Sequence, residues 1–448
     1  MEVRELMKYT KEQIMELVEE EDVEFVRLQF VDILGNLKNL AITVSQLERA
    51  LNNEYEFDGS SIQGYLRIEE ADLFLHPDLD TFEIFPWRPQ QGKVARLICD
   101  VYHIDGTPYE GDPRQVLKRT LKKASDMGYE FVVGPECEFF LFHTDDFGNP
   151  TTVTHEKAGY FDMGPIDLGE NARRDMVLSL EDMGFEILES HHEIAPGQHE
   201  IDFKHDEALV SADNIMTFKL TVKSIAKRHG LHATFMPKPT SDQCGSGMHT
   251  HMQLLKDGKN FFSDESDEMG LSKEAYYFMG GIMKHMKGIT LLANPLVNSY
   301  KRLVPGCEAP AYIAWSQSIR GPLIRIPRAN AKDMRIELRS PDAAANPYLM
   351  LAACLSAGLE GIEKKIMPPK RVDKSLSSMS EEEKKEIGIE RLPIDMHEAI
   401  NEFEKDEFIK ESLGKYLSKK YIELKRAEWQ DYRSKVTDWE VNQYLYRV

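Results

Sequence analysis

Cysteine is scarce and scattered in this sequence. The 448 residues include five cysteines, and no two of them form a CxxC pair. A disulfide framework usually shows an even, regularly spaced set, and a structural zinc site usually shows paired thiolates. We therefore expect neither. The five cysteines are Cys99, Cys137, Cys244, Cys307 and Cys354.

Long hydrophobic runs are also missing. Apolar stretches such as Phe139–Phe142 and Leu349–Leu355 are far shorter than the roughly 20 residues that a membrane-spanning helix needs. The first residues, MEVRELMKYTKEQIMELVEEED, are rich in glutamate and lack the apolar core of a signal peptide. The sequence therefore predicts a cytoplasmic protein with no membrane partner.

Positive charge is in the minority. The 55 lysines and arginines are outnumbered by 76 acidic residues, which gives a net charge of -21. So acidic a surface repels a phosphate backbone, and we expect no nucleic-acid partner. The same charge is compatible with metal ions, cationic substrates or simple solubility. No GxxxxGK[ST] or GxGxxG motif is present either, which argues against the common nucleotide-binding folds.

The patterning predicts an α+β protein with a small domain over residues 1–105 and a large one over 106–448. Helical spacing covers 11–21, and Ser45 with Glu48 forms a capping-box pattern before a short helix. Asp112 and Pro113 fit the N-cap and first position of the helix that opens the large domain. Residues 364–388 are polar and predict an exposed connection, and helices follow from 392. Strands are expected over 24–32, 41–44, 72–75, 82–85 and 94–102.

Two glutamates interrupt an otherwise apolar strand, FVVGPECEFFLF. Because strand side chains alternate, Glu136 and Glu138 point to one face and Cys137 points to the other. Two neighbouring carboxylates repel each other and are costly to desolvate, and a divalent cation such as Mg²⁺ or Mn²⁺ removes both costs. The alternative for an isolated pair is one salt-bridged glutamate and one that faces solvent.

Two further segments carry polar residues at strand positions. In HHEIAPGQHEIDF, Glu193 and Glu200 flank an Ala-Pro-Gly turn, so a hairpin would bring them together, although an ordinary polar hairpin has the same pattern. In GSGMHTHMQ, His249 and His251 share one face, and the glycines allow the backbone to approach a phosphate. Histidines that are simply packed in a core or on a surface are the alternative.

The last segment, RIELRSPDAAAN, alternates charge with core residues. Arg335, Glu337 and Arg339 share a face, either as an ion-pair ladder or as a metal ligand between phosphate-binding cations. Guanidinium groups bind phosphate and carboxylate in a bidentate manner. Together these patterns indicate chemistry on a metal-bound nucleotide. The upstream arginines are Arg302, Arg320, Arg325 and Arg328.

These segments, in this order, resemble type I glutamine synthetases along essentially the whole chain. The matching stretches are FDGSSIQGY, GPECEFFLF, EIAPGQHEIDF, GSGMHTH, NSYKRLVPGCEAP and RIELRSPDAAANPYL. The short subtype of Gram-positive bacteria and archaea fits best. The resemblance implies an N-terminal β-grasp domain and a large catalytic domain with an antiparallel sheet. It also implies a homo-oligomer, a dodecamer of two hexameric rings with active sites between subunits, in which the last residues, TDWEVNQYLYRV, reach the opposite ring.

The resemblance implies an ATP-dependent ligation of ammonia to glutamate, through γ-glutamyl phosphate, with two or more Mg²⁺ or Mn²⁺ ions per site. Glu138, Glu193 and Glu200 match the ligands of one metal, and Glu136, His249 and Glu337 match those of the other. The other matches are listed by role: Arg302, Arg320, Arg339 and Gly245 for glutamate or the transferred phosphate; His251, Arg325 and Arg335 for ATP; Asp58 of the adjacent subunit for ammonium; Glu308 for the flap that closes the site.

Four positions bear on affinity and regulation. Cys244 stands where the family usually has an asparagine that helps to hold glutamate, and Gln253 replaces a usual serine. Glu390 lies where regulated enzymes carry a tyrosine that is adenylylated, so we expect no such modification. Arg67 matches an arginine tied to feedback inhibition by glutamine in the short subtype.

Two other functions use the same scaffold. A ligase could join glutamate to an organic amine, and a catalytically silent homologue could sense nitrogen by binding a regulatory protein. The ammonium residue Asp58 and the flap residue Glu308 favour ammonia as the acceptor. The complete set of metal ligands argues against a silent protein.

Overall fold

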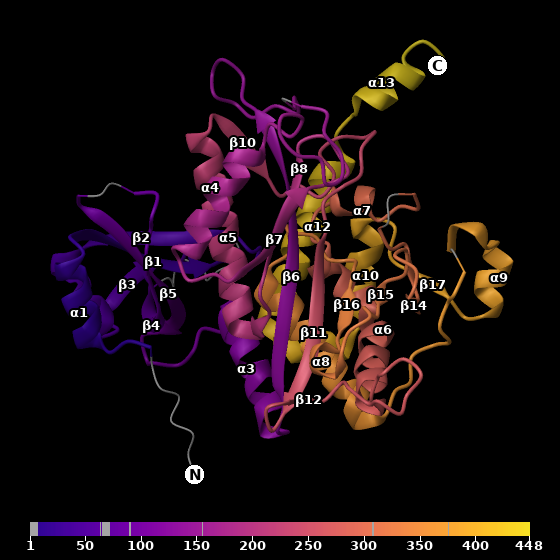
Figure 1. The fold of residues 1–448 in the computed structure, drawn as a ribbon, viewed down its shortest axis with the longest axis horizontal. Helices are drawn as coiled ribbons and strands as arrows, with labels where there is room; N and C mark the ends of the chain where they lie inside the picture. Colours follow the sequence, from indigo (N-terminus) through magenta and orange to yellow (C-terminus); the bar gives the residue numbers. More distant parts are fainter. Residues whose placement is uncertain are drawn as a thin grey trace.

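The chain is organised around two β-sheets of different size. The computed structural model describes residues 8–62, 64, 72–88, 91–154, 156–306, 309–374 and 376–448. Residues 23–103 contribute the strands of the smaller sheet, which lies to one side of the molecule (Figure 1). The larger sheet runs through the middle of the molecule.

The smaller sheet has five strands in the order β2-β1-β5-β4-β3, and β1 runs parallel to β5 while the other neighbours are antiparallel. Helix α1 (Lys11–Glu20) packs Ile14 and Val18, one turn apart, into the core of this unit. This is the β-grasp arrangement that the resemblance implies. The strands are β1 (Val23–Val31), β2 (Leu37–Thr43), β3 (Tyr55–Asp58), β4 (Asp72–Ile84) and β5 (Lys93–His103).

The larger sheet has ten strands, and its main path is β14-β15-β16-β11-β6-β8-β7. Its neighbours are antiparallel except for the parallel pair β14 and β15. The strands are β6 (Glu130–His143), β7 (Ile187–His192), β8 (Gln198–Phe203), β9 (Asp206–Glu207), β10 (Leu231–Thr234), β11 (Met248–Lys256), β12 (Lys259–Asn260), β14 (Trp315–Ser316), β15 (Ile324–Arg325) and β16 (Ile336–Leu338).

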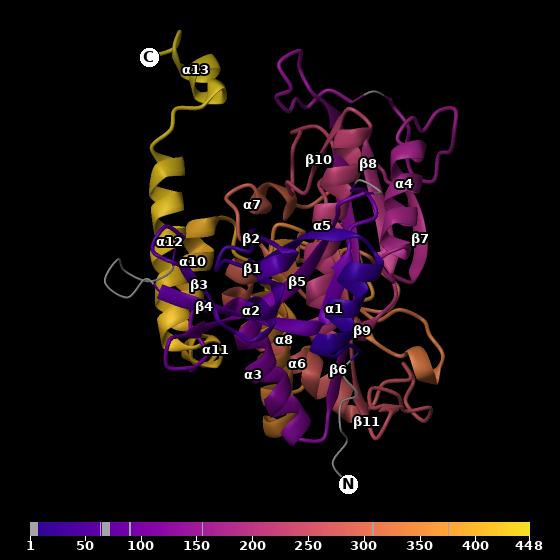
Figure 2. The ribbon, with the colours of Figure 1, turned by 90° about the vertical axis from the view of Figure 1, so that its left-hand side faces the viewer.

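Helices cover one face of the larger sheet and form the main core with it. Val133, Cys137 and Phe139 of β6 belong to this core, together with residues of helices α3, α5, α6 and α8. The other face therefore remains available for polar side chains. In Figure 2 the smaller sheet faces the viewer and lies in front of these helices. The bounds are α3 (Pro113–Asp126), α4 (Glu170–Glu181), α5 (Ala208–Arg228), α6 (Lys273–Ala293), α7 (Ser299–Arg302) and α8 (Pro347–Lys364).

The C-terminal part is helical, as the sequence predicts. The last helix, α13, projects away from the rest of the chain in both views (Figures 1 and 2). No helix among the described residues combines the length and apolar character that a membrane crossing requires. The helices are α9 (Glu381–Glu386), α10 (Met396–Lys405), α11 (Glu407–Leu413), α12 (Lys415–Arg433) and α13 (Asp438–Tyr444).

Local predictions had mixed outcomes. Asp112 caps α3, with Pro113 at its first turn, as predicted. The capping box at Ser45 is wrong, because α2 (Leu47–Leu51) begins without a side-chain cap and the Ser45 hydroxyl pairs with Thr43 instead. The predicted strands at 72–75 and 82–85 belong to one strand, β4.

The connection over 364–388 is more ordered than predicted. It contains the short helix α9, and Val372 packs with Ala314 in a small apolar cluster. After it, β17 (Glu390–Arg391) pairs with β13 (Tyr312–Ile313), and Glu390 forms an ion pair with Lys287 at 2.6 Å. The prediction was wrong because it relied on the polar composition, whereas a few apolar residues such as Val372 fold this segment back onto the chain.

Candidate functional site

A polar cavity of about 400 Å³ opens on the face of the larger sheet that the core helices do not cover. Strand alternation explains its character, because β6, β8, β11 and β16 turn their apolar residues to the helices and their charged residues to the cavity side. Its lining comprises Glu136, Glu138, Tyr160, Glu189, His191, Glu193, Ile194, Gln198, Glu200, Asp202, Cys244, Gly245, His249, Arg302, Ala309, Arg320, Arg325 and Arg339.

Strand register brings distant charged residues side by side. Glu138 of β6 lies opposite Glu200 of β8, and Glu200 lies opposite His191 of β7. On the other side of β6, Glu136 lies opposite His249 of β11. The predicted sharing of a strand face by Glu136 and Glu138, with Cys137 turned to the core, is thus present.

The first acidic group consists of Glu138, Glu193 and Glu200, with His191 beside them. Ligand atoms of His191, Glu193 and Glu200 lie within 4.8 Å of one another, because the β7–β8 hairpin folds as predicted. Burial and the neighbouring charge of Glu193 raise the pKa of Glu138 to about 7. Burial raises the pKa of Glu200 well above its ordinary value, and the neighbouring negative charges of Asp202 and Glu138 raise it further. A bound divalent cation would relieve this repulsion, so the donor set fits a hard metal ion.

The second group combines two carboxylates with an imidazole. Ligand atoms of Glu136, His249 and Glu337 lie within 4.8 Å of one another. Burial, together with the nearby charge of Arg339, lowers the pKa of His249 to about 4, so its imidazole is neutral at pH 7. A neutral imidazole keeps the lone pair that a metal ligand needs. This set also fits a divalent cation.

Glu337 is flanked by two guanidinium groups. It accepts hydrogen bonds from Arg339 and from Nε of Arg325, and its side chain is completely buried. Nε of Arg339 is also buried, and it has no hydrogen-bond partner among the described residues. A buried unpaired donor beside the cavity is well suited to an anionic group of a ligand.

Arg302 lies against the backbone at the other end of the cavity. Its guanidinium donates to the carbonyl oxygens of Ser340 at 2.7 Å and Arg339 at 3.1 Å. A Cβ at Gly247 would lie 2.5 Å from Nη2 of Arg302, so any other residue there would displace this guanidinium from its place. Gly245 lines the same end, whereas Arg320 lines the cavity from the β14–β15 connection.

A chain of hydrogen bonds connects Glu136 of the second acidic group to Arg335 through His251. Nε of Arg335 donates to Nδ1 of His251 at 3.1 Å, and Nε2 of His251 lies 2.7 Å from Glu136. Since arginine can only donate, Nδ1 of His251 is the acceptor and Nε2 carries the proton toward Glu136. This fixes the orientation of the His251 ring next to the cavity.

Four described site residues do not line this cavity: His251 and Glu337 hydrogen-bond to residues that do, Arg335 bonds to His251, and Asp58 lies apart. Asp58 ends β3 in the smaller sheet, where it is exposed and lines a separate hollow of about 490 Å³ with Phe30, Lys38 and Ile62. Within a single chain it does not meet the residues of the cavity. Glu308 and Arg67 lie outside the described residues.

The two departures from the family pattern have different surroundings. Cys244 is partly exposed and lines the cavity. Gln253 lies away from it and accepts a hydrogen bond at 3.1 Å from Asn260, whose amide also donates to the carbonyl of Met334. Gln253 therefore supports the segment before Arg335, whereas Cys244 can contact a ligand directly.

Sequence reasoning missed several polar residues of the cavity. His191 lies near Glu193 and Glu200, Asp202 lies opposite Glu136, and Gln198 donates to Glu138 at 2.8 Å. Alternation along HEIDF, the end of the hairpin, already put Asp202 on the face of Glu200. No local signal pointed to Tyr160, because it comes from a loop that approaches the cavity from another part of the chain.

Comparison with protein families covers nearly all of the chain. The family described as "Glutamine synthetase, beta-Grasp domain" matches residues 22–104, and "Glutamine synthetase, catalytic domain" matches residues 110–444. A glutamine synthetase of Clostridium saccharobutylicum is 61% identical over 98% of this chain and 99% of its own length. One of Staphylococcus aureus strain Mu50 is 56% identical over 98% of both chains.

Solved structures are similar over the same span. A structure described as a GmaS/ADP complex has a TM-score of 0.88 at 35% identity, covering 96% of this chain and 99% of that one. A cryo-electron microscopy structure of Plasmodium falciparum glutamine synthetase has a TM-score of 0.86 at 27% identity, covering 97% and 99%. With both family domains matched and curated relatives at 55–61% identity, this chain belongs to the glutamine synthetase family.

Proposed function

We propose that the chain catalyses the ATP-dependent ligation of ammonia to L-glutamate, giving L-glutamine, ADP and phosphate. Relatives that carry the name glutamine synthetase at 55–61% identity over 98% of the chain support this activity. The observation that carries it at the site is the cavity in which two acidic groups meet Arg302, Arg320 and Arg339. Such a set suits phosphoryl transfer to a carboxylate.

The first step is activation of the acceptor. A γ-carboxylate oxygen of glutamate attacks the terminal phosphorus of ATP, and the bond from that phosphorus to the bridging oxygen of ADP breaks. Arg339, whose buried Nε lacks a partner among the described residues, donates to the transferred phosphoryl group or to the carboxylate. Arg325, Arg335 and His251 contact the nucleotide phosphates. The ADP named in the related GmaS complex supports a nucleotide site.

Two divalent cations complete the site, and we propose Mg²⁺ or Mn²⁺. Glu138, Glu193 and Glu200 would hold one, with His191 beside them, and Glu136, His249 and Glu337 would hold the other. When bound, such cations neutralise charge on the phosphates. The carboxylates hold these positions with little rearrangement, because strand register already fixes them.

The second step forms the amide bond. Ammonia attacks the acyl carbon of γ-glutamyl phosphate, the bond from that carbon to the phosphate oxygen breaks, and the departing phosphate takes up the proton that the nitrogen loses. Asp58 of an adjacent chain takes a proton from ammonium, and Glu308 closes the site against water. Arg302 and Gly245 position the glutamate. The exposure of Asp58, away from the cavity of its own chain, supports this division of roles between subunits.

The assembly that we propose is a homo-oligomer, a dodecamer of two hexameric rings. Helix α13 projects from the chain with Trp439 and Tyr444 exposed, which is consistent with a role in contacts between rings. Arg67 is proposed to couple glutamine to inhibition. If Arg67→Ala and the wild type have the same glutamine inhibition curve, that role is wrong.

The test uses purified protein with ATP, Mg²⁺ and glutamate, in the presence of ammonium. Phosphate and glutamine should appear in equal amounts, and Glu136→Ala should abolish both. Phosphate with a different amide product, in competition with organic amines, would favour the glutamate–amine ligase. ATP and metal binding without any turnover would favour a nitrogen sensor that acts through a regulatory protein.

A further inference from the structure

The segment that joins β6 to α4 carries two buried carboxylates, Glu156 and Asp167. Neither lines the catalytic cavity, whereas Tyr160, which lies between them in the chain, does. A buried carboxylate is tolerated only where it is paired and hydrogen-bonded. The partners of these two acids therefore show what the segment holds in place.

Their partners include two histidines, each of which comes directly before a glutamate of the first acidic group. His192 precedes Glu193, and His199 precedes Glu200. Because neighbouring residues of an extended chain point to opposite faces, the histidines lie behind the sheet where the glutamates face the cavity. Both histidines are fully buried, and their rings lie edge to face with centres 4.9 Å apart. They form a polar layer directly behind the acidic group.

Glu156 holds the first histidine. Its Oε1 lies 3.0 Å from Nε2 of His192 and also accepts from the amide of Gly197, while its other oxygen accepts from the amide of Ala158. Nδ1 of His192 lies 2.7 Å from the carbonyl oxygen of Glu193, so both ring nitrogens face acceptors and both carry protons. One carboxylate thus joins the end of β7, the hairpin turn and its own segment, and through His192 it fixes the backbone of Glu193.

Asp167 holds the second histidine through an arginine. It accepts from Nη1 of Arg173 on α4 at 2.7 Å, and the same Nη1 lies 2.9 Å from Nδ1 of His199. Since arginine can only donate, Nδ1 of His199 is the acceptor. A Cβ at Gly169 would lie 2.5 Å from Cε1 of His199, so the start of α4 packs directly on this ring. The ring that precedes Glu200 is therefore fixed from α4.

The same residues do not form a further metal site. Ligand atoms of Asp167, His192 and His199 lie within 4.8 Å of one another, a spacing that a metal ion could use. Both nitrogens of His192 donate, however, and a protonated nitrogen has no lone pair for a metal. Arg173 already supplies the positive charge beside Asp167. The group is an ion-pair network, in which two cations balance two buried carboxylates.

We propose that Glu156 and Asp167 are positioning residues for the divalent cation of the first acidic group, an inference that rests on the proposed function. They fix His192 and His199, which in turn set the backbone from which Glu193 and Glu200 reach the cavity. Partners that orient metal ligands from behind typically contribute 10–100-fold to metal affinity. Since Tyr160 lies between the two acids, one segment sets both the cation site and this part of the cavity wall.

The test is titration of the full-length protein with Mn²⁺, in which the electron paramagnetic resonance signal of free Mn²⁺ reports binding without turnover. We expect two ions per wild-type chain. Glu156→Gln should weaken one of them at least tenfold and leave the other within twofold, because its amide NH₂ would face either the amide of Ala158 or the N–H groups of His192 and Gly197. The weakened ion should be the one that Glu200→Gln also weakens.

Asp167→Asn tests the second carboxylate, and it should weaken the same ion at least tenfold. Glu170→Ala is the matched control, because Glu170 accepts from the amide of Gly164 in the same segment at 2.9 Å and bonds to neither histidine. It should keep both affinities. The unfolding temperature of each variant separates a loss of folded protein from a loss of affinity, and if Glu156→Gln does not fold, Asp167→Asn decides.

Unchanged Mn²⁺ affinity in both Glu156→Gln and Asp167→Asn overturns the proposal, and a loss in one variant alone overturns it for the other carboxylate. An equal loss in Glu170→Ala also overturns it, since general order of the segment would then be the cause. So does a wild type that binds no Mn²⁺. A wild type that binds two ions but forms no glutamine refutes the proposed reaction, whereas the positioning role still stands if the variants lose affinity.

Discussion

At the residue scale, the site depends on charged side chains that alternate with core residues along short strands. Ile336 and Leu338 are fully buried against the helices, and Glu337 between them lies on the other face, close to Glu136 and His249. Because alternation is local, the sequence predicted which side chains share a face. It did not predict that His191 lies opposite Glu200, since pairing between strands depends on register across the whole sheet.

Glu138 illustrates how a site can be built at the expense of stability. Its pKa of about 7 reflects burial and repulsion by Glu193, so its ionised form destabilises the metal-free protein at neutral pH and above. Glu138→Gln should raise the free energy of unfolding of the metal-free protein by about 1–2 kcal/mol at pH 8. Denaturant unfolding in the presence of a chelator measures this, and ligase activity should fall at least a hundredfold.

Mg²⁺ binding should also distinguish the wild type from Glu138→Gln. Added Mg²⁺ should raise the unfolding temperature of the wild type more than that of Glu138→Gln, because the variant lacks one carboxylate ligand. Ser125→Glu, which adds a carboxylate at an exposed position of α3 outside the cavity lining, serves as a charge control and should leave the Mg²⁺ response unchanged. Lower stability of metal-free Glu138→Gln than of the wild type would contradict the repulsion argument.

Cys244 should be the most reactive of the four cysteines that the structure describes. Cys99, Cys137 and Cys354 are buried, and burial raises the pKa of Cys354 to about 12, whereas Cys244 lines the cavity and is partly exposed. Iodoacetamide should therefore modify Cys244 first and inhibit the ligase. Peptide mapping checks the site, and Cys244→Ser should resist inhibition, while modification of Cys137 ahead of Cys244 would contradict the prediction.

At the scale of the elements, a buried histidine joins three helices. Nδ1 of His285 on α6 lies 2.7 Å from Asp406, the N-cap of α11, and Nε2 lies 2.6 Å from Glu360 on α8. Both partners are acceptors, so both ring nitrogens must carry protons and the imidazole is cationic. Glu360 also accepts from Lys284 and Lys364, and the ring of Phe408 packs against the histidine.

This arrangement predicts a pH-dependent stability. Burial alone would lower the pKa of His285, but the hydrogen bonds to Asp406 and Glu360 outweigh it, and the pKa is raised above 6.5. The stabilisation is therefore complete below pH 6.5 and is lost as the pH rises through the raised value. Thermal unfolding from pH 6 to 9 should show a smaller decline for His285→Gln than for the wild type.

His229→Gln provides the matched control, since His229 pairs with Asp175 at 2.9 Å on the surface. Its pH profile should follow that of the wild type. Parallel profiles for His285→Gln and the wild type would show that His285 does not contribute.

Elements that carry strong local signals were predicted well, and those shaped by tertiary contacts were not. The β7–β8 hairpin followed from its Ala-Pro-Gly turn, and α3 followed from Asp112 and Pro113. The start of α2 was mispredicted because Ser45 finds a partner in Thr43 instead of capping the helix. Helix α9 was missed because its segment folds through contacts to distant residues such as Ala314.

At the scale of the whole molecule, one arginine links the smaller sheet to the core helices. Arg114 on α3 is buried and donates to Asp100 of β5 at 2.8 Å, to Asp78 of β4 at 2.7 Å, and to both oxygens of Asp213 on α5. The hydroxyl of Tyr348 donates to the same Asp213 at 2.6 Å. No sequence motif predicts this network, because residues that hydrogen-bond to each other in it lie up to 135 positions apart in the sequence.

Removal of Arg114 should loosen the whole chain. Arg114→Met leaves buried aspartates without their counter-charge, so we expect a loss of about 3–5 kcal/mol in the free energy of unfolding. Lys118→Met, which removes a partly exposed partner of Asp100, should cost no more than about 1 kcal/mol. Urea unfolding measures both, and equal losses in the two variants would contradict the central role of Arg114.

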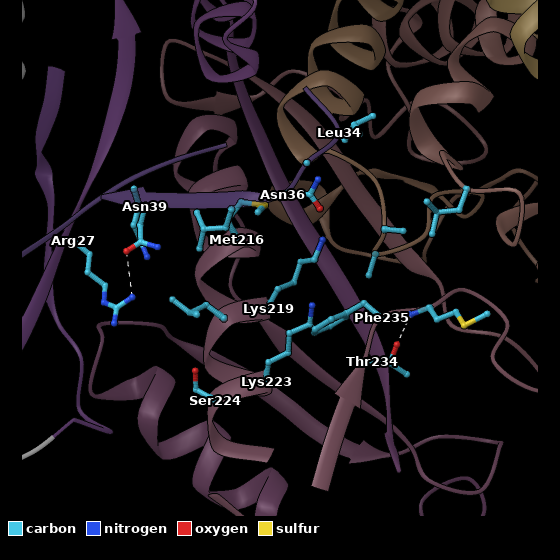
Figure 3. Close-up of a pocket in the computed structure, with 18 of the residues that line it drawn as sticks. Arg27, Leu34, Asn36, Asn39, Met216, Lys219, Lys223, Ser224, Thr234 and Phe235 are labelled. Carbon is cyan, nitrogen blue, oxygen red and sulfur yellow. Dashed lines mark hydrogen bonds between the residues drawn. The ribbon is translucent and has the colours of Figure 1, made fainter. Parts of the chain in front are cut away.

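Family resemblance predicted the architecture of the whole molecule far better than patterning did. Six matching stretches implied the β-grasp unit and the catalytic sheet. Two clusters of possible metal ligands contain five of the six residues that the resemblance assigns to metals, and Glu138, the sixth, lies opposite Glu200; their role stays a prediction. No sequence pattern predicts the cavity between the smaller sheet and α5 (Figure 3), since lining residues such as Arg27, Lys219 and Lys425 come from three segments that no motif connects.

The position of Asp58 has a consequence for how activity depends on concentration. Because Asp58 lies on the exposed end of β3, away from the cavity of its own chain, an isolated chain would contain no complete site under the proposed mechanism. Specific activity would then track the fraction of chains in the assembly and fall on dilution, whereas each folded chain would remain intact. The quantity that a cell would regulate is thus the association equilibrium as much as the catalyst itself.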